Sequence, residues 1–395
     1  MLLSDFNYDL PDERIAKYPP KVRGTTRLLV LDKATGTIKD DYYKNLDEYL
    51  NPGDVLILND TRVMRSRLFA TLPDGRKREL VVLERHGDEP QKVMYRGKLH
   101  DGDRLTVSND NAFEEHARRR GEYGATEPRN DRPLGRGRAL LDGREGAFRE
   151  SITIAHVLGN GIAEVSSSVP LADLAEKYGA VPLPPYLHRD ADENDTKRYQ
   201  TVWAKHMGSA AAPTASLNMT EELLEKLRQK GVIIKYLTLH VGLGTFLPIR
   251  TDKVEDHKMH SEWFHIPEDT LVEIKRITST GDASAGGPPN QRIRGKADAA
   301  GPVRPRIIAV GTTIARTLEY YARTGKTEGE DDIFIYPGFE FKLVDALLTN
   351  FHAPKSTVLM LASAFAGWDH LKNAYQHAVD EGYNFLSYGD SMFIC

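Results

Sequence analysis

The chain has 395 residues, which is long enough for two or three domains with a sizeable core. It is 40% hydrophobic, and its 53 basic and 57 acidic residues leave a net charge of only −4, so wholesale disorder is excluded. No apolar run approaches the roughly 18 residues that span a bilayer, and the N-terminus lacks the basic region of a secretory signal. The single cysteine, Cys395, excludes a disulfide framework and cysteine-rich metal sites. We therefore expect a soluble, cytoplasmic protein without membrane contact.

The first 62 residues predict compact α/β structure. Two apolar runs, Arg27–Leu31 and residues 55–58, indicate buried strands, and a short amphipathic stretch at 43–50 lies between them. The second strand ends in the polar turn 59–62.

Between about residues 65 and 168 the pattern changes to short alternating runs separated by turns. Such regular spacing is typical of a small antiparallel barrel or sandwich, and the residues leave both open. The runs lie at 80–83, 92–95, 104–107, 151–154 and 162–165. Residues 114–150 contain nine arginines without sustained periodicity, which favours a solvated insertion or a basic arm that contacts nucleic-acid phosphates.

From residue 171 onward, helices and strands alternate. Leu171–Tyr178 predicts a helix, and the prolines of 182–186 exclude one there. The later elements are, in chain order, a helix capped by Thr220, a strand at 232–240, a helix at 270–277, a strand at 306–310 and helices at 314–321 and 374–383. This alternation predicts a parallel or mixed sheet with crossover helices. Residues 279–305, rich in glycine, proline and alanine, predict a flexible loop.

Several loops that combine small and polar residues follow predicted strands. They lie at 59–62, 208–214, 242–245, 311–313 and 350–352. In open α/β sheets, ligands bind outside the carboxyl ends of strands, so the recurrence indicates a binding edge. Leu247 replaces the last glycine of the dinucleotide pattern, which argues against an NAD site. The amides of 311–313 suit an anion, although an ordinary helix cap explains them equally well.

Two further groups of residues could carry chemistry. The first contains His257, His260, Glu262 and His265; it permits a metal site, an acid–base pair or an ordinary satisfied cluster. Thiols and an H-E-x-x-H motif are absent, so we expect no metal and favour His260 or Glu262 as a general acid or base. The second group is the set of polar residues within the apolar runs of 331–367, which predicts the wall of a site because buried polar groups need partners.

Twelve short segments of the sequence form a recognisable set: residues 5–11, 27–30, 58–63, 183–186, 199–202, 211–214, 239–246, 259–262, 309–313, 332–338, 344–352 and 387–390. Together and in this order, they resemble one family, the S-adenosylmethionine:tRNA ribosyltransferase-isomerases of queuosine biosynthesis. They span nearly the whole chain apart from the insertions at about 112–150 and 279–305.

The resemblance implies a reaction and a fold. Family members use S-adenosylmethionine as a ribosyl donor to 7-aminomethyl-7-deazaguanine at the wobble position of tRNA, leaving epoxyqueuosine and releasing adenine and methionine. The implied fold is a mixed-sheet α/β domain with an inserted small antiparallel β-barrel. We accordingly expect an α/β domain of residues 1–64 plus 169–395 and a barrel domain of residues 65–168, in a protein that acts as a monomer.

The chemistry of this reaction suggests roles for individual residues. A base must remove the proton next to the sulfonium, and His260 or Glu262 suits that task; Asp60 and Asp390 could orient sugar hydroxyls or the amine, and His352 is a further catalytic candidate. The expected donor-binding residues are Pro213, Thr214, Gly242, Gly244, Thr245, Gly311, Thr312, Thr313 and Asn350. The expected RNA-binding residues are Arg62, Arg67, Tyr186 and Tyr388.

The chain departs from the family pattern at three positions. Asn218 stands where a histidine is usual, and Leu247 and Asn384 stand where arginines are common. Each loss of a charged contact could remove on the order of 1–3 kcal/mol of binding. Two alternatives therefore stay open: a divergent paralogue with an altered substrate, and a non-catalytic relative that binds tRNA or S-adenosylmethionine.

Overall fold

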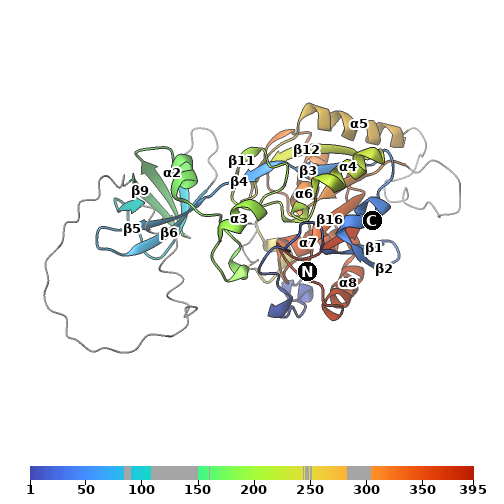
Figure 1. The fold of residues 1–395 in the computed structure, drawn as a ribbon, viewed down its shortest axis with the longest axis horizontal. Coiled ribbons are helices and arrows are strands. Elements are labelled where there is room, and N and C mark those ends of the chain that lie inside the picture. The colour runs from blue at the N-terminus through green and yellow to red at the C-terminus, as the bar shows by residue number, and fades with distance from the viewer. Residues whose placement is uncertain are drawn as a thin grey trace. The chain divides into compact units, whose positions relative to one another are not determined.

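The computed structural model describes residues 1–83, 90–107, 150–159, 161–242, 244, 249, 251–282 and 304–395. The chain folds into two compact units (Figure 1): unit 1 comprises Met1–Val63 and Leu183–Cys395, and unit 2 comprises Met64–Pro182. Within the described ranges, no helix is long and apolar enough to cross a membrane.

Unit 1 is built on a mixed sheet of nine strands. Their order across the sheet is β15-β13-β12-β3-β14-β16-β17-β1-β2. The strands are β1 (Arg27–Leu31), β2 (Ile38–Tyr42), β3 (Val55–Asn59), β12 (Ile233–Leu239), β13 (Glu262–His265), β14 (Ile307–Val310), β15 (Glu328–Asp331), β16 (Ala346–Asn350) and β17 (Ser391–Ile394). The central strands β12, β3, β14 and β16 run parallel, so their carboxyl ends meet at one edge of the sheet.

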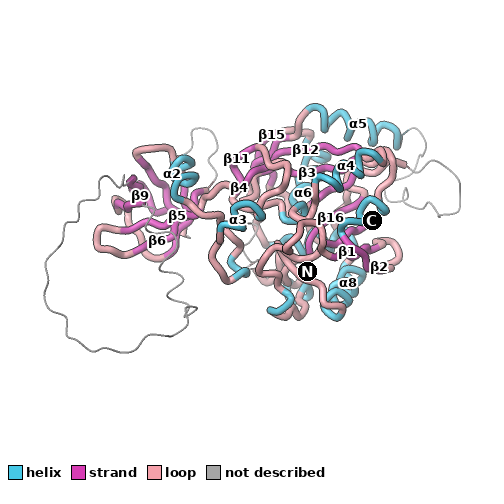
Figure 2. Tube along the Cα trace, viewed as in Figure 1, coloured by secondary structure: helices cyan, strands magenta, loops and turns pink. Residues whose placement is uncertain are grey.

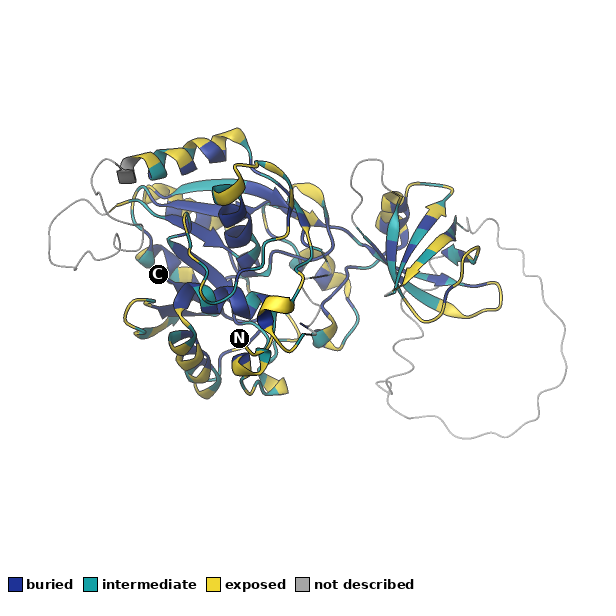
Figure 3. Ribbon diagram, turned by 180° about the vertical axis from the view of Figure 1, so that it is seen from behind, coloured by how far each residue is buried: buried dark blue, intermediate teal, exposed yellow. Residues whose placement is uncertain are grey.

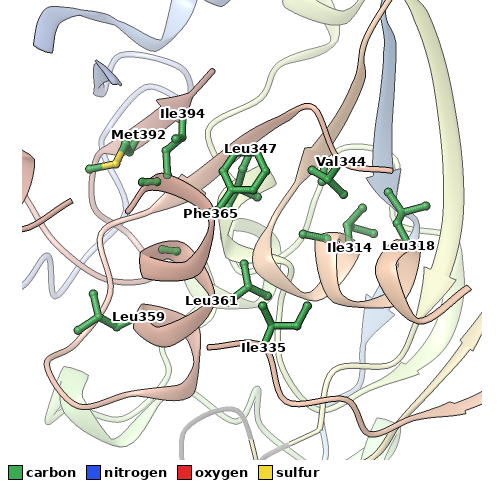
Figure 4. Close-up of a cluster of buried hydrophobic side chains, with 14 of the residues drawn as sticks. Ile314, Leu318, Ile335, Val344, Leu347, Leu359, Leu361, Phe365, Met392 and Ile394 are labelled. Atoms are coloured by element: carbon green, nitrogen blue, oxygen red, sulfur yellow. The ribbon is translucent and has the colours of Figure 1, made fainter. Parts of the chain in front are cut away.

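Helices cover both faces of this sheet, as Figures 1 and 2 show. The α-helices of unit 1 are α3 (Glu193–Arg198), α4 (Glu221–Gln229), α5 (Glu268–Asp282), α6 (Thr312–Thr324), α7 (Thr357–Ala366) and α8 (Trp368–Asp380). Successive side chains of a strand point to opposite faces of the sheet, and a hydrophobic core lies on each face. Ile57 belongs to the core that includes α5 to α8, and its neighbour Leu56 belongs to the core that includes α4. Figure 4 shows part of the larger core, where Ile314 and Leu318 of α6 lie near Leu347 of β16.

Unit 2 is a closed antiparallel barrel with strand order β10-β7-β6-β5-β8-β9. The strands are β5 (Arg67–Thr71), β6 (Lys77–Val82), β7 (Lys92–Arg96), β8 (Arg104–Val107), β9 (Glu150–Gly159) and β10 (Ile162–Ser167). Their inward residues form a separate apolar core, seen as the buried strand faces in Figure 3. The structure thus selects the barrel over the sandwich and confirms the predicted fold class.

One predicted boundary needs correction. Helix α2 (Leu171–Tyr178) was expected in the α/β domain, but its apolar residues Leu171, Leu174 and Tyr178 join the barrel core. The second crossing between the units therefore lies after Pro182 rather than at residue 168. The helix was predicted with its observed bounds; its amphipathic pattern could not say which core it would cover.

The remaining elements are short. Strands β4 (Thr61–Val63) and β11 (His206–Ser209) form a two-stranded parallel sheet, and the predicted amphipathic stretch at 43–50 is the 3₁₀ helix Tyr43–Tyr49. The arginine-rich insertion at 112–150 and the loop predicted at 279–305 fall almost wholly outside the described residues.

Candidate functional site at the carboxyl edge of the sheet

A cavity of about 360 Å³ opens at the carboxyl edge of the large sheet. This volume lies within the range of roughly 300–1,000 Å³ that is common for small-molecule sites. The lining residues are 211–215, 311–313, 349–356, Tyr186, Val241, Ile249, Val358, Leu386 and Ser387. They follow β14, β16, β11 and β12 in the chain. Three of the five loops predicted to form a binding edge, those at 208–214, 311–313 and 350–352, contribute lining residues, whereas residues 59–62, Gly242 and Gly244 do not.

The start of helix α6 forms one wall of the cavity. Its N-cap is Gly311, which has a φ of 103° and supplies no side-chain acceptor to the helix. The first amides of a helix have no acceptor within it, and the helix dipole places partial positive charge there. Because Gly311, Thr312 and Thr313 all line the cavity, this wall offers hydrogen-bond donors to an anion.

A second helix start, that of α7, lies on the same cavity. The Ser356 hydroxyl accepts a hydrogen bond from the amide of Leu359 at 3.2 Å, and Ser356 and Val358 line the cavity. The preceding residue, Lys355, is exposed and adds a full positive charge. None of the described lining residues carries a carboxylate. The cavity is therefore biased toward negatively charged ligand groups.

Asn350, at the end of β16, lines the cavity and contains a buried acceptor. Its side chain is 3% exposed, and its Nδ2 donates to the carbonyl of Asp390 at 3.4 Å, which orients the amide. Its Oδ1 has no hydrogen-bond partner among the described residues. A buried unpaired oxygen is costly unless a ligand supplies the missing donor.

His352 lies on the same loop as an uncharged group. Its Nε2 lies 2.9 Å from the Thr349 hydroxyl, and its carbonyl accepts a hydrogen bond from the Tyr8 hydroxyl. Burial lowers the pKa of His352 to about 3, because the protein interior disfavours the imidazolium. The ring is therefore neutral at pH 7.

Beside the cavity lies an ion cluster, by which we mean Glu262, Arg316 and Asp331. Arg316 Nη2 contacts Glu262 Oε2 at 2.6 Å, and Arg316 Nε contacts Asp331 Oδ1 at 2.6 Å. All three side chains are buried. Burial raises the pKa of Asp331 to about 6, although Arg316 opposes this shift. Arg316 and Asp331 were missed from the sequence because nothing in their local pattern marks a charged pair as buried.

The ion cluster contacts His260, which lines neither the cavity nor the smaller hollow beside it. His260 Nε2 lies 3.4 Å from Glu262 Oε1, which also accepts a hydrogen bond from the amide of Gly242 at 3.0 Å. The His260 ring packs on Gly244, where an added Cβ would lie 2.5 Å from it. A smaller hollow lined by Met259 and Arg316 shares Thr312 and Thr313 with the cavity, which brings this region next to the cavity wall.

The structure gathers six of the nine expected donor-binding residues at the cavity. They are Pro213, Thr214, Gly311, Thr312, Thr313 and Asn350. Gly242 and Gly244 lie instead against Glu262 and His260. Thr245 and Leu247 fall outside the described residues.

Asp390 and Tyr388, near the chain's end, are engaged within the protein. The Asp390 carboxylate accepts backbone amides of Arg27 and Asn384, both at 2.7 Å, and burial raises its pKa. The buried Tyr388 donates its hydroxyl to Asp195 at 2.6 Å. Asn218, at a position where the family usually has histidine, is buried and donates to the carbonyl of Gly389 at 3.1 Å.

Asp60 lies at the end of β3, away from the cavity lining. Its Oδ1 accepts a hydrogen bond from the Thr238 hydroxyl at 2.7 Å, and its Oδ2 lies 3.6 Å from Nε2 of the exposed His206. Arg62 is exposed on β4, which pairs with the strand that begins at His206. Of the other expected RNA-binding residues, Tyr186 lines the cavity, and Arg67 belongs to the barrel, where it pairs with Glu79.

Five aromatic side chains in this part of unit 1 form two contact groups, which together we call the aromatic row. His240 stacks on Trp263 with ring centroids 5.2 Å apart, and Trp263 stacks on His265 at 6.5 Å. Trp203 lies 6.2 Å from Tyr236 and donates Nε1–H to the carbonyl of Asn59. All except His240 are partly exposed. The row was missed from the sequence because its residues are scattered from 203 to 265.

Comparison with known proteins agrees with the resemblance seen in the sequence. Residues 3–285 and 294–394 match the family model described as queuosine biosynthesis protein. The chain belongs to this family.

Two relatives and one solved structure show what the chain is similar to. Over its full length and theirs, the chain is 46% identical to the S-adenosylmethionine:tRNA ribosyltransferase-isomerase of Pelodictyon phaeoclathratiforme and 41% identical to that of a Sulfurihydrogenibium species. It is 30% identical to a crystal structure described as S-adenosylmethionine tRNA ribosyltransferase from Thermotoga maritima, with a TM-score of 0.49 and coverage of 99% of this chain and 100% of that one.

Proposed function

We propose that this protein is an S-adenosylmethionine:tRNA ribosyltransferase-isomerase of the cytoplasm that acts as a monomer. It transfers and isomerises the ribosyl group of S-adenosylmethionine onto 7-aminomethyl-7-deazaguanine at the wobble position of tRNA, giving epoxyqueuosine and releasing adenine and methionine. The observation that carries the proposal is the full-length likeness to relatives of this name, at 46% identity, in a chain with a suitable cavity.

The cavity is the proposed site of the donor. Its walls are mostly apolar, with Phe351 and Val241 among the lining, and its polar groups are confined to the helix starts and the β16 end. This distribution suits a nucleoside with one charged end, because apolar walls bury the rings while a few polar groups fix the orientation.

We assign proton removal to His260 rather than Glu262. Both oxygens of Glu262 are engaged, one by Arg316 and one by the amide of Gly242 and the ring of His260. The His260 side chain is 24% exposed and can therefore meet a substrate. In this arrangement Glu262 orients the imidazole and balances the positive charge that it gains on accepting a proton.

The aromatic row is the proposed contact for the RNA. Single-stranded bases stack on partly exposed aromatic rings, and the phosphates need cations nearby. Trp263 and Trp203 offer such rings, while the exposed Arg62 and Lys205 offer the charges. The row directly precedes a cavity wall in the chain, because His240 is followed by the lining residue Val241.

One incubation tests the function. The protein is mixed with S-adenosylmethionine and tRNA that carries the 7-aminomethyl-7-deazaguanine precursor, free adenine is measured by chromatography, and the digested tRNA is analysed by mass spectrometry. We expect adenine and epoxyqueuosine in equal amounts. Adenine release only with another RNA or amine would favour the divergent paralogue, and donor binding without turnover would favour the non-catalytic relative.

A second measurement tests the RNA contact. Arg62→Ala and Trp263→Ala should each weaken tRNA binding, and Arg62→Ala should also reduce its salt dependence. The exposed Lys372→Ala, on α8, is the control and should bind normally. Unchanged binding by both variants at the row would contradict this assignment.

A further inference from the structure

We propose that the cavity contains a clamp for a zwitterionic α-amino acid, in which the start of helix α6 holds the carboxylate and Asn350 accepts the ammonium group. The proposal deepens the proposed function, on which it rests, because the methionine part of the donor is such a group. The proposal also implies that the product methionine binds to the same clamp.

The carboxylate half of the clamp follows from the helix starts. Thr312 and Thr313 begin the 13-residue helix α6, and Val358 belongs to the first turn of the 10-residue helix α7. All three line one cavity, so the positive ends of two helix dipoles act on the same ligand. The Gly311 N-cap supplies no side chain that would compete for the α6 amides.

The ammonium half follows from Asn350. The hydrogen bond from its Nδ2 to the Asp390 carbonyl fixes the amide, so that Oδ1 is left as a buried acceptor without a partner among the described residues. An ammonium group has three donors and no acceptor, which is what this oxygen lacks. Since no described lining residue is acidic, a neutral oxygen must perform this task.

The two halves distinguish amino acids from simple anions. A phosphate or a plain carboxylate could use the helix amides, but it would leave the Asn350 Oδ1 buried and unpaired. An amine without a carboxylate would meet the positive helix ends and Lys355 without a negative group to offset them. Both partial ligands should therefore bind less tightly than the complete α-amino acid.

The test compares three thioethers by calorimetry without RNA, so that no turnover occurs. The first is S-adenosylhomocysteine, the second is its analogue without the carboxylate, and the third is its analogue without the amino group. We expect each truncated compound to bind about ten- to a hundredfold more weakly than the first, as is usual for a lost charge-assisted hydrogen bond.

Two variants assign the halves to their residues. Asn350→Leu should abolish the preference for the amino group and keep the preference for the carboxylate. Thr312→Pro removes one amide at a position where helices accept proline, and it should reduce only the preference for the carboxylate, whereas Thr312→Ala keeps that amide and serves as its matched control. Urea unfolding of each variant verifies that it is folded.

The outcomes separate this inference from the proposed function. The clamp is refuted if the truncated thioethers bind as tightly as S-adenosylhomocysteine, or if Asn350→Leu weakens all three compounds equally. A different result would contradict the proposed function: no adenine is released with the precursor tRNA, although the three thioethers still bind with the expected preferences. Competition by methionine against S-adenosylhomocysteine, lost in Asn350→Leu, is a further supporting result.

Discussion

The cavity and the ion cluster adjoin each other at Thr312 and Thr313, yet they treat polar groups in opposite ways. In the ion cluster, both carboxylates contact Arg316 at 2.6 Å, and Asp331 also accepts a hydrogen bond from the Thr317 hydroxyl. In the cavity, the α6 start and the Oδ1 of Asn350 are left without protein partners among the described residues. A region whose charges are already paired can hold a neighbour in position, whereas a region with unpaired groups is suited to bind.

This contrast supports assigning ligand binding and proton transfer to different groups of residues. Among the described lining residues, His352 is the one imidazole, and burial lowers its pKa to about 3, so that it is too weak a base to remove a proton near pH 7. In the proposed assignment, the base is instead His260, which contacts Glu262 of the ion cluster. Binding and proton transfer are thus assigned to neighbouring but separate groups.

The strongest test of this division is His260→Ala. We expect adenine release to fall by about 10²–10⁴-fold, as is usual for the loss of a general base, while donor binding in the cavity stays near normal. Rates come from quenched assays and affinities from calorimetry. His377→Ala, on α8, is the control, and an unchanged rate in His260→Ala would overturn the assignment of the base.

Removing the cation from the ion cluster should chiefly affect stability. Arg316→Met leaves Glu262 and Asp331 buried without their partner, so we expect the free energy of unfolding to fall by about 3–5 kcal/mol. Lys235→Met breaks the ion pair with the exposed Asp269 and should cost less than about 1 kcal/mol. Equal losses in urea unfolding would show that the ion cluster lacks the structural role assigned to it.

Gly244 and Gly242 lie against His260 and Glu262 and allow a test that depends only on the space around a new Cβ. Gly244→Ala places a Cβ 2.5 Å from the His260 ring, whereas at Gly242 the nearest atoms lie at 3.9 Å. Displacing the ring should slow adenine release on the order of tenfold to a hundredfold in Gly244→Ala and much less in Gly242→Ala. A larger effect at Gly242 than at Gly244 would argue against His260 as the group that matters.

The last prediction concerns the neutral His352 of the cavity and the stability of the protein in acid. An unfolded histidine gains its proton below about pH 6.5, whereas burial lowers the pKa of folded His352 to about 3. The folded state should therefore lose about 1.4 kcal/mol of stability per pH unit from this residue as the pH falls from 6.5 toward 3. In His352→Gln, the free energy of unfolding should fall less between pH 7 and pH 5, which urea unfolding at the two pH values would measure. An equal decrease in the wild type and the variant would contradict this prediction.

Much of the fold could be predicted because its strands and helices carry clear local signals. The apolar run Arg27–Leu31 and the helix Leu171–Tyr178 were expected with their observed bounds, and Thr220 caps α4 as expected, accepting from the amide of Leu223. Strand β5 was not predicted, since its apolar run spans only three residues, 68–70. Which unit α2 joins depends on packing between segments and could not be read from its own residues.

The sequence predicted three of the loops that form the cavity, but it did not predict the ion cluster. Loops after parallel strands converge by topology, so Thr214, Thr313 and Asn350 could be grouped from the order of the elements along the chain. The pairing of Arg316 with both Glu262 and Asp331 joins three separate elements, α6, β13 and β15. No local pattern encodes such a contact, and without it His260 and Glu262 could not be told apart.

The position of β17 has a consequence for how the protein is made. This strand, formed by Ser391–Ile394, fills the place between β16 and β1 and pairs with both. Until those residues leave the ribosome, β1 and β2 have no neighbour to attach them to the rest of the sheet. The nascent chain can complete its barrel early, but the large sheet closes only after translation has passed residue 394, and a premature stop shortly before it would leave a chain with two exposed strand edges that invite aggregation.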